Sequence, residues 1–264
     1  MFAEERQEQI KEQIQNKGAV TTTGLMECFH VSIETIRRDL LQMERAGLLR
    51  RVHGGAVVVS EVRPFQIRSD RESVRGAQKA SLAEKAMELI SENDVIGIDS
   101  GSSTALFFAR ALKEHFRHLT VVTCSLDVFE ILHGYADFQV ILCGGYFHEK
   151  EHYFYGTPAI DTMSQLFLQK AFICPAAISL EYGLYDHQPE VYLTQKKMMA
   201  SSDEIIILAD SSKFEKKALM KFDDMHPKYQ YVTDYEFSDG LMQLYQQNGI
   251  HIVKGNKSFS DIEG

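Results

Sequence analysis

The stretch from Val31 to Ala56 constrains the fold more than any other part of this chain. Ser32 is a good helix cap, and apolar residues follow it at spacings of three, four and three, namely Ile33, Ile36, Leu40 and Met43. This spacing predicts an amphipathic helix with those four side chains facing inward. Apolar residues on both sides of Gly54 and Gly55 predict a β-hairpin directly after the helix.

Two more helices are expected before this one. The apolar pattern predicts an amphipathic helix over residues 4–16 and a short helix over residues 22–29, followed by a tight turn. A short helix, a turn and a longer helix form the helix-turn-helix arrangement, and a following hairpin makes it winged. The sequence therefore predicts a winged helix-turn-helix DNA-binding domain over residues 1–58.

The polar face of the longer helix points to DNA contacts. Arg38 lies opposite the apolar stripe, with Thr35 and Gln42 beside it, and such side chains can hydrogen-bond base edges. Arg37 is better placed for a phosphate. An amphipathic surface helix with two solvated arginines is the simpler interpretation, but the three-helix context favours DNA. The candidate DNA-binding residues are Ser32, Thr35, Arg37, Arg38, Gln42, Arg50, Arg51 and His53.

The charge distribution argues for a local DNA footprint. The chain has a net charge of −9, whereas residues 1–58 hold eight Lys/Arg and eight Asp/Glu, so all of the excess falls after residue 58. A globally basic surface is absent, and the local signal is the arginines near the longer helix and the hairpin. One small head makes few contacts, so we expect a homodimer or homotetramer on operator DNA, with the acidic body projecting away from it.

Some classes of protein are disfavoured. No apolar run approaches the roughly 18 residues of a membrane span and no signal peptide opens the sequence, so we expect a cytoplasmic protein without a membrane partner. The four cysteines, Cys28, Cys124, Cys143 and Cys174, are far apart and form no metal-type pair. Cys124, Cys143 and Cys174 each end an apolar run, so buried free thiols are expected rather than zinc or a disulfide, and neither a metal nor a cofactor is expected.

The rest of the chain predicts an α/β domain over residues 77–264, joined to the head by a charged linker over residues 59–76 with little periodicity. A new helix is expected from Gln78. Short apolar strands alternate with helical stretches, which indicates a mostly parallel sheet covered by helices. The expected strands are residues 95–99, 120–124, 138–143, 171–174, 205–208, 229–233 and 250–253.

Loops at the carboxyl ends of these strands are the candidate ligand site. Residues 100–104 read Ser-Gly-Ser-Ser-Thr between a strand and a helix, where hydroxyls, free amides and the helix dipole favour an anion. This loop lacks the lysine of a P-loop and is not a GxGxxG fingerprint. Ser125, Gly145 and Lys213 follow other strand ends. The simpler interpretations are an ordinary Ser/Thr helix cap and a solvated lysine.

Several ordered blocks resemble the DeoR-type bacterial transcriptional regulators. They cover about residues 4–254 in the order of the family, as residues 31–32, 35–40, 47–48, 51–56, 99–104, 122–126, 142–145, 170–172 and 208–214. The resemblance implies a sensor domain similar to the sugar-phosphate isomerase fold, with phosphorylated sugars or related metabolites as effectors. It assigns effector binding to Asp99, Ser100, Gly101, Ser102, Ser103, Thr104, Ser125, Gly145 and Lys213.

This sequence departs from the family at three places. Cys124 stands where the family usually has Asn, Gln169 replaces a frequent Asp, and the stretch from Pro175 to Ala177 replaces a glycine-containing one. A thiol cannot supply the paired donor and acceptor of an amide. These departures imply an atypical effector or weaker binding.

The sequence therefore predicts a repressor of carbohydrate-metabolism genes, switched by a phosphorylated sugar or a related metabolite, and not an enzyme. The main alternative is a sugar-phosphate isomerase with an appended DNA-binding head, which needs a carboxylate to move a proton. The loop after residues 171–174 offers no acid before Glu181, which leaves Asp99 and Asp210 as candidates. A second alternative is an adaptor whose winged helix binds protein.

Overall fold

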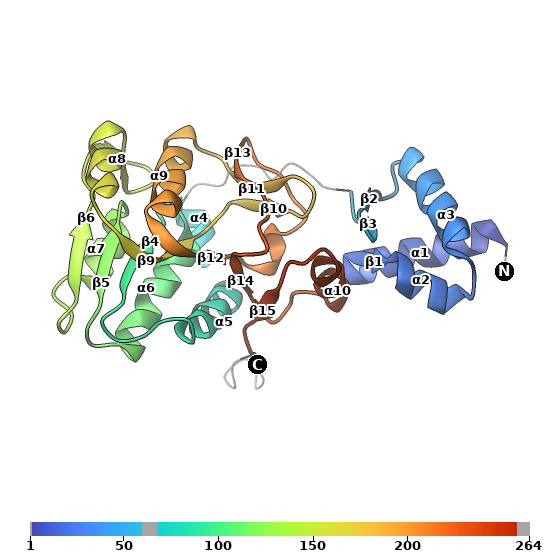
Figure 1. Ribbon diagram of the computed structural model, residues 1–264, viewed down its shortest axis with the longest axis horizontal. Helices are drawn as coiled ribbons and strands as arrows, with labels where there is room; N and C mark the ends of the chain where they lie inside the picture. Colours follow the sequence, from blue (N-terminus) through green and yellow to red (C-terminus); the bar gives the residue numbers. More distant parts are fainter. Residues whose placement is uncertain (1, 60–67, 258–264) are drawn as a thin grey trace.

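The computed structural model describes residues 2–59 and 68–257. A small N-terminal head and a larger α/β body lie end to end along the long axis of the molecule (Figure 1). The head contains α1 (Ala3–Lys17), β1 (Ala19–Thr21), α2 (Thr22–Phe29), α3 (Ile33–Arg45), β2 (Arg50–Val52) and β3 (Gly55–Val57). The predicted winged helix-turn-helix is confirmed.

Local signals in the sequence set the ends of the head's helices. The Ser32 hydroxyl accepts a hydrogen bond from the Thr35 amide at the start of α3, as expected for a cap. Ile36, Leu40 and Met43 are buried with residues of α1 and α2. The prediction was wrong for Ile33, whose side chain is exposed because it lines a surface groove with residues of α2 and the wing.

The wing has three strands rather than the two expected. Its order is β1-β3-β2, so that a strand from before α2 pairs with the second strand of the hairpin. A side chain at Gly55 would place its Cβ 2.0 Å from the carbonyl oxygen of Val20, so β1 can approach β3 only beside a glycine. A strand of three residues shows no alternating pattern, which is why the sequence did not reveal it.

The body is built on a seven-stranded sheet in the order β15-β14-β12-β9-β4-β5-β6, and all its pairings are parallel. This confirms the predicted α/β architecture with a mostly parallel sheet. The strands are β4 (Val95–Ile98), β5 (Thr120–Thr123), β6 (Gln139–Leu142), β9 (Leu168–Ile173), β12 (Ser202–Leu208), β14 (Gln230–Thr233) and β15 (Ile252–Lys254).

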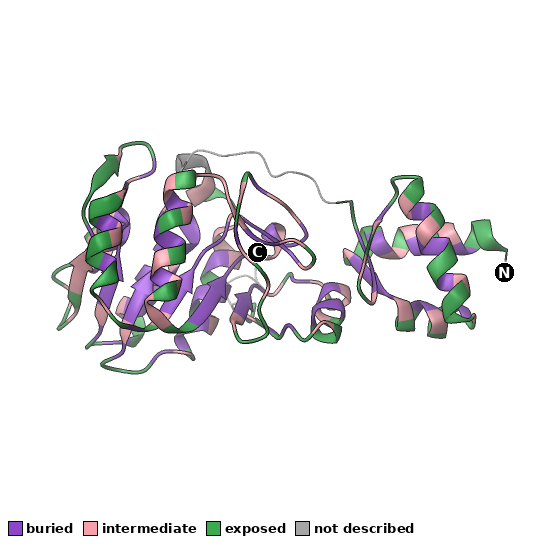
Figure 2. Cartoon of the chain, turned by 45° about the horizontal axis from the view of Figure 1, so that its top comes forward, coloured by how far each residue is buried: buried purple, intermediate pink, exposed green. Residues whose placement is uncertain are grey.

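Helices cover both faces of this sheet, and the strands between them are buried (Figure 2). One face packs against α5 (Gly76–Met87), α6 (Ser103–His115) and α7 (Leu126–Leu132). The other face forms the second hydrophobic cluster, to which α8 (Thr157–Ser164), α9 (Pro189–Ala200) and α10 (Asp239–Gln247) contribute. None of these helices, nor any other in the described residues, is long and apolar enough to cross a membrane.

Several short elements were not predicted. Two small antiparallel sheets lie beside the main one, formed by β7 (Tyr146–His148) with β8 (Tyr153–Tyr155), and by β10 (Ala177–Ser179), β11 (Gly183–Asp186) and β13 (Met220–Asp223). A single 3-10 turn, η1 (Ser211–Lys213), follows β12. The expected linker contains a helix, α4 (Arg68–Ser73), and α5 begins at Gly76 rather than at Gln78; residues 60–67 lie outside the described residues.

The head and the body share a packed boundary. β1 and α1 lie against α10, where the Ser238 hydroxyl donates to the carbonyl oxygen of Lys17. The side-chain amide of Asn248 donates to the carbonyl oxygen of His53, at 2.9 Å. Ala19 and Val57 of the head are fully buried within the body's hydrophobic cluster. The wing is therefore held against the body, which the sequence did not predict.

Candidate functional site

The exposed face of α3 carries the side chains that were predicted to read DNA. Arg37, Arg38 and Gln42 are exposed, and Thr35 is half-buried with its hydroxyl 3.0 Å from that of Ser32. Arg37 forms an exposed ion pair with Glu34 at 3.3 Å. The structure thus brings together, on one face of one helix, the base-reading candidates of the sequence analysis.

A buried ion pair fixes this helix to the head. The Arg6 guanidinium lies 2.5 Å from the Asp39 carboxylate, and the two side chains are 5% and 1% exposed. Sequence reasoning missed the pair, although Asp39 stands three residues after Ile36 and four before Met43, on the apolar side of α3. A carboxylate at such a position needs a partner, because burial of an unpaired charge is costly.

The wing residues are divided between two environments. Arg51 pairs with Glu44 at 2.9 Å, and His53 is exposed. Both line a groove of about 620 Å³, together with Arg37 of α3 and Glu181 of the body. The Arg50 side chain points elsewhere, into the body, where it pairs with carboxylates. Contrary to expectation, the structure separates Arg50 from the other DNA-contacting candidates, because acidic groups of the body attract it.

The predicted effector loops meet at the carboxyl ends of the central strands. The Ser102 hydroxyl caps α6 by accepting from the Thr104 amide at 3.2 Å, and Gly101 has a φ of +73°. Two small cavities of about 10 and 20 Å³ lie here. The first is lined by Arg71, Gly101, Ser102, Ser103, Leu106, Ser125, Asp127 and Glu151. The second is lined by Arg71, Val74, Arg75, Lys79, Ser103, Asp210 and Lys213.

Three basic residues around these cavities were missed. Arg71 of α4 pairs with Glu151, Arg75 lies 3.2 Å from the Asp210 carboxylate, and Lys79 donates to the carbonyl oxygen of Val74 at 2.5 Å. Their spacing of four residues gave no usable signal, because Arg71 lies on α4, Arg75 precedes α5 and Lys79 lies on α5. Both cavities are far smaller than the several hundred Å³ of a typical ligand site, and Arg71 lines both of them.

Asp99, another predicted effector residue, holds the backbone of the loops rather than lining a cavity. Asp99 is buried and accepts hydrogen bonds from the amides of Ser100 and Cys174, at 2.7 and 2.9 Å, and from the side chain of Gln195, at 2.9 Å. The Gln195 amide also donates to Asp186. Asp99 lines neither cavity, so its observed contact is with the loop backbone rather than with open space.

Ser100, Thr104 and Gly145 are also absent from the two cavity linings. Ser100 and Thr104 are buried. A Cβ on Gly145 would lie 2.4 Å from the carbonyl oxygen of Tyr155, so this glycine permits close packing beside β8. The structure therefore gathers Gly101, Ser102, Ser103, Ser125 and Lys213 around the cavities.

The departures from the family pattern have local structural roles. Gln169 accepts a hydrogen bond from the Val95 amide at 2.6 Å, and the carbonyl oxygen of Pro175 accepts one from the Lys213 ammonium at 3.1 Å. Cys124 is a free, buried thiol, as are Cys143 and Cys174, whereas Cys28 is exposed. The expectation of buried free thiols at Cys124, Cys143 and Cys174 is confirmed.

The Asp99 carboxyl predicts a particular dependence of stability on pH. Burial raises its pKa from 3.8 to about 7, and the charge of Asp186 adds to the rise, against hydrogen bonds from Cys174 and Gln195. The folded chain then binds a proton that the unfolded chain has already lost, so the free energy of unfolding should fall by up to about 1.4 kcal/mol per pH unit between about pH 4 and 7 and level off above that.

Urea denaturation of the wild type and of Asp99→Asn at several pH values measures this effect. The variant cannot ionise at this position, so its stability should decline less steeply as the pH rises. Equal slopes for the two proteins would show that the Asp99 carboxylate is ionised in the folded chain throughout this range.

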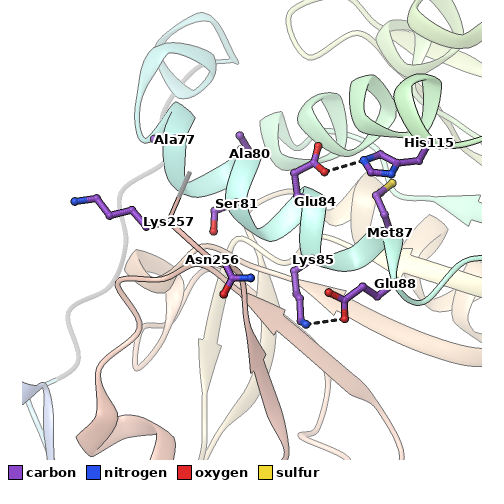
Figure 3. Close-up of a pocket in the computed structure, with 10 residues that line it drawn as sticks. All are labelled: Ala77, Ala80, Ser81, Glu84, Lys85, Met87, Glu88, His115, Asn256 and Lys257. Carbon is purple, nitrogen blue, oxygen red and sulfur yellow. Dashed lines mark hydrogen bonds and ion pairs between the residues drawn. The ribbon is translucent and has the colours of Figure 1, made fainter. Parts of the chain in front are cut away.

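A larger groove lies on another side of the body, between α5 and the segment ending at Lys257 (Figure 3). Its volume is about 890 Å³. Glu84 and Glu88, which line it, are paired with His115 and Lys85 respectively. None of the predicted site residues lines this groove, and its carboxylates do not suit an anion.

Two parts of the chain match known domain families. Residues 6–62 match the DeoR-like helix-turn-helix domain and residues 75–235 match the DeoR C-terminal sensor domain. The chain is 30% identical to the L-fucose operon activator of Haemophilus influenzae, over 94% of this chain and 98% of the relative. It is 27% identical to the putative aga operon transcriptional repressor of Escherichia coli O157:H7, over 94% and 93% of the two chains. Ribose 5-phosphate isomerase A from Neisseria gonorrhoeae aligns with 52% of each chain, at 24% identity and a TM-score of 0.39.

A winged helix-turn-helix with exposed arginines on α3, joined to an α/β body, is the architecture of a DNA-binding protein with a separate second domain. The two family matches extend over most of the chain. The chain belongs to the DeoR family, and it is a DNA-binding transcriptional regulator.

Proposed function

We propose that this regulator is a repressor of carbohydrate-metabolism genes that binds operator DNA as a homodimer or homotetramer and is switched by a phosphorylated sugar or a related metabolite. The observation that best supports this proposal is the cluster of cations around Ser103. Arg71, Lys79 and Lys213 line cavities at the N-terminus of α6 that also contain the hydroxyls of Ser102 and Ser125.

The physical chemistry of this cluster suits a phosphate. The amides at the start of a helix and the helix dipole favour an anion, and hydroxyls and ammonium groups can donate to phosphate oxygens. Lys213 is only 9% exposed, so its charge is weakly screened by water. A phosphate here would compete with Glu151 for Arg71, and that exchange would open the closed cavity.

Carboxylates beside the cations suit the hydroxyls of a sugar. Asp127 and Glu151 line the first cavity and Asp210 lines the second. One carboxylate oxygen of Glu151 is buried without a hydrogen-bond partner among the described residues. Buried acceptors of this kind are normally satisfied, so a ligand hydroxyl is a suitable donor. The names of the relatives, which refer to L-fucose and aga operons, also support a carbohydrate role.

The isomerase alternative is less well supported by the geometry. An aldose–ketose isomerase needs a carboxylate that reaches the proton of the substrate. Asp99 lies behind the loop and outside both cavity linings, and Asp210 is engaged with Arg75 and with the amide of Ser212. The segment from Pro175 to Ala177 contributes no acid. These placements argue against Asp99 and Asp210, the two carboxylates that the sequence offered for catalysis.

Lys213→Ala should abolish the response to metabolite. A panel of sugar phosphates and the corresponding free sugars is screened against the full chain by thermal denaturation. At least one phosphate should stabilise the wild type, by about 2.7 kcal/mol at a concentration of 100 Kd. The variant should lose this shift and still bind DNA, because Lys213 lies in the body.

The matched control is Lys217→Ala, which removes the same charge from the same segment. The Lys217 ammonium lies 3.3 Å from the centre of the Tyr182 ring and lines neither cavity. The Lys217→Ala variant should be stabilised by the sugar phosphate as much as the wild type. Equal stabilisation by free sugars and their phosphates, or a Lys213→Ala variant that responds fully, would count against a phosphate site here.

A further inference from the structure

The body contains a socket that holds an arginine of the wing. Arg50 lies on β2, and its guanidinium pairs with Glu181 at 2.5 Å and with Glu215. It also lies over the Tyr182 ring, 5.3 Å from the ring centre. The Arg50 side chain is only 15% exposed, although it comes from the edge of the wing. A stacking ring and two carboxylates are a suitable environment for a guanidinium.

Glu215 is itself held firmly in place. Its side chain is 2% exposed, and one oxygen accepts hydrogen bonds from the Leu180 amide at 3.1 Å and from the Tyr245 hydroxyl at 2.6 Å. Its backbone has a φ of +55°, an unfavourable conformation for a residue with a side chain. A strained residue that places a buried carboxylate against another part of the chain points to a function for that contact.

The second carboxylate of the socket, Glu181, lies beside the candidate DNA-binding residues of α3 and the wing. Glu181 lines the same 620 Å³ groove as Arg37, Arg51 and His53, and Gln247 of α10 lines it as well. A carboxylate in this groove repels phosphate, and the same carboxylate pairs with Arg50. The body thus acts on the DNA-binding surface in two ways, through repulsion and through capture of a cation.

We propose that this contact opposes DNA binding, and that the Glu181–Glu215 socket and the DNA backbone compete for Arg50. In the conformation described here Arg50 neutralises the buried charge of Glu215. When DNA binds, Arg50 leaves the socket for a phosphate, and Glu215 retains only the hydrogen bonds from Leu180 and Tyr245. The cost of leaving a buried carboxylate without its cation lowers the affinity for DNA.

The socket is connected to the strand-end cavities by a very short path. Lys213 lines a cavity and Glu215 forms the socket, with Phe214 between them. The Phe214 ring packs on Phe237 and Tyr245, with ring centres 4.6 and 5.6 Å away. A ligand that binds Lys213 therefore acts only two residues from the carboxylate that holds Arg50. A ligand shifts this equilibrium only if it prefers one of the two positions.

The test measures binding of the full chain to a short mixed-sequence DNA duplex by fluorescence anisotropy, without metabolite, over a range of KCl concentrations. The variant is Glu181→Gln combined with Glu215→Gln, which removes the charge of the socket. It should bind the duplex about five-fold tighter or more, the lower end of a typical coupling between sites. Binding equal to that of the control described next, or weaker, overturns the proposal.

The double variant has two fewer negative charges than the wild type, which by itself favours DNA binding. The control is therefore Glu149→Gln combined with Asp161→Asn, which removes the same amount of charge elsewhere. Both residues are exposed; Asp161 lies on α8, at the end of the body away from the head (Figure 1), and Glu149 lies between β7 and β8. The control should change binding much less. Because Glu215→Gln alters a buried group, Glu181→Gln alone is measured too. Its side chain is 45% exposed, and it should show a smaller increase in affinity.

A double-mutant cycle separates competition for Arg50 from simple repulsion by Glu181. In the wild type, Arg50→Ala removes both the socket contact and the phosphate contact, so its net effect on affinity should be small. In the background without socket charge, Arg50→Ala removes only the phosphate contact, so binding should weaken and the salt slope should fall by about 0.9. Equal effects of Arg50→Ala in both backgrounds would show that no exchange takes place.

Discussion

Asp39→Ala should unfold the head and abolish DNA binding, with a loss of about 3–5 kcal/mol of stability in the N-terminal part of the chain. The substitution leaves the Arg6 guanidinium, 5% exposed, without its carboxylate. Breaking a buried pair in this way costs far more than breaking an exposed one. Because Asp39 lies on α3, the helix that carries Arg38 would lose its fixed position on α1.

The distribution of tyrosines allows the head to be followed separately. The chain has no tryptophan, and all of its tyrosines come after residue 58, so tyrosine fluorescence reports on the body and far-ultraviolet circular dichroism on both parts. In urea, the helical signal of the variant should begin to fall before the fluorescence changes. Arg37→Ala is the control, because its pair with Glu34 is 61% and 76% exposed and should contribute less than about 1 kcal/mol. A variant that unfolds like this control would refute a structural role for the buried pair.

Arg38→Ala should cost about 1–3 kcal/mol of operator affinity per half-site, and a dimer would lose twice that amount. Arg38 is exposed in the middle of the exposed face of α3, so the fold should be unaffected. An arginine that bonds a guanine edge discriminates between bases, whereas one on a phosphate does not. The variant should therefore lose preference at one position of the site.

Selection of sequences from a random duplex pool by the wild type supplies the operator for this measurement. The affinity of Arg38→Ala is then determined for that operator and for single-base variants of it. Arg37→Ala, at the neighbouring phosphate-facing position, should weaken binding to all of them by a similar factor. The same uniform loss in Arg38→Ala would show that Arg38 does not read bases.

Regular patterns made much of the fold predictable. The spacing of Ile36, Leu40 and Met43 located α3, and alternation of apolar strands with helices indicated the parallel sheet. Three-residue strands such as β1 and β10, which lie outside any longer apolar run, give no such signal in the sequence. Ile33 shows the opposite limit, because an apolar residue in the right register can still face a surface groove in the folded chain.

The candidate site was predictable where chemistry and local geometry coincide, as in the Ser-Gly-Ser-Ser loop at the start of α6. Arg71 was missed because it reaches the loop from α4, a short helix within a segment expected to lack structure. Arg50 was placed at the free surface because its partners, Glu181 and Glu215, are more than a hundred residues away in the sequence. Contacts between distant segments depend on the tertiary fold, which local patterns do not encode.

The methyl groups of Ala19 and Val57 limit how the head can move. Both belong to the head's sheet, yet both are fully buried in the hydrophobic cluster of the body. Full separation of the two parts would bring these groups into water at roughly 25 cal/mol for each Å² exposed. A tilt or slide across α10 keeps them covered and avoids that penalty. Movement of the head should therefore be limited to displacements in which its sheet stays in contact with α10.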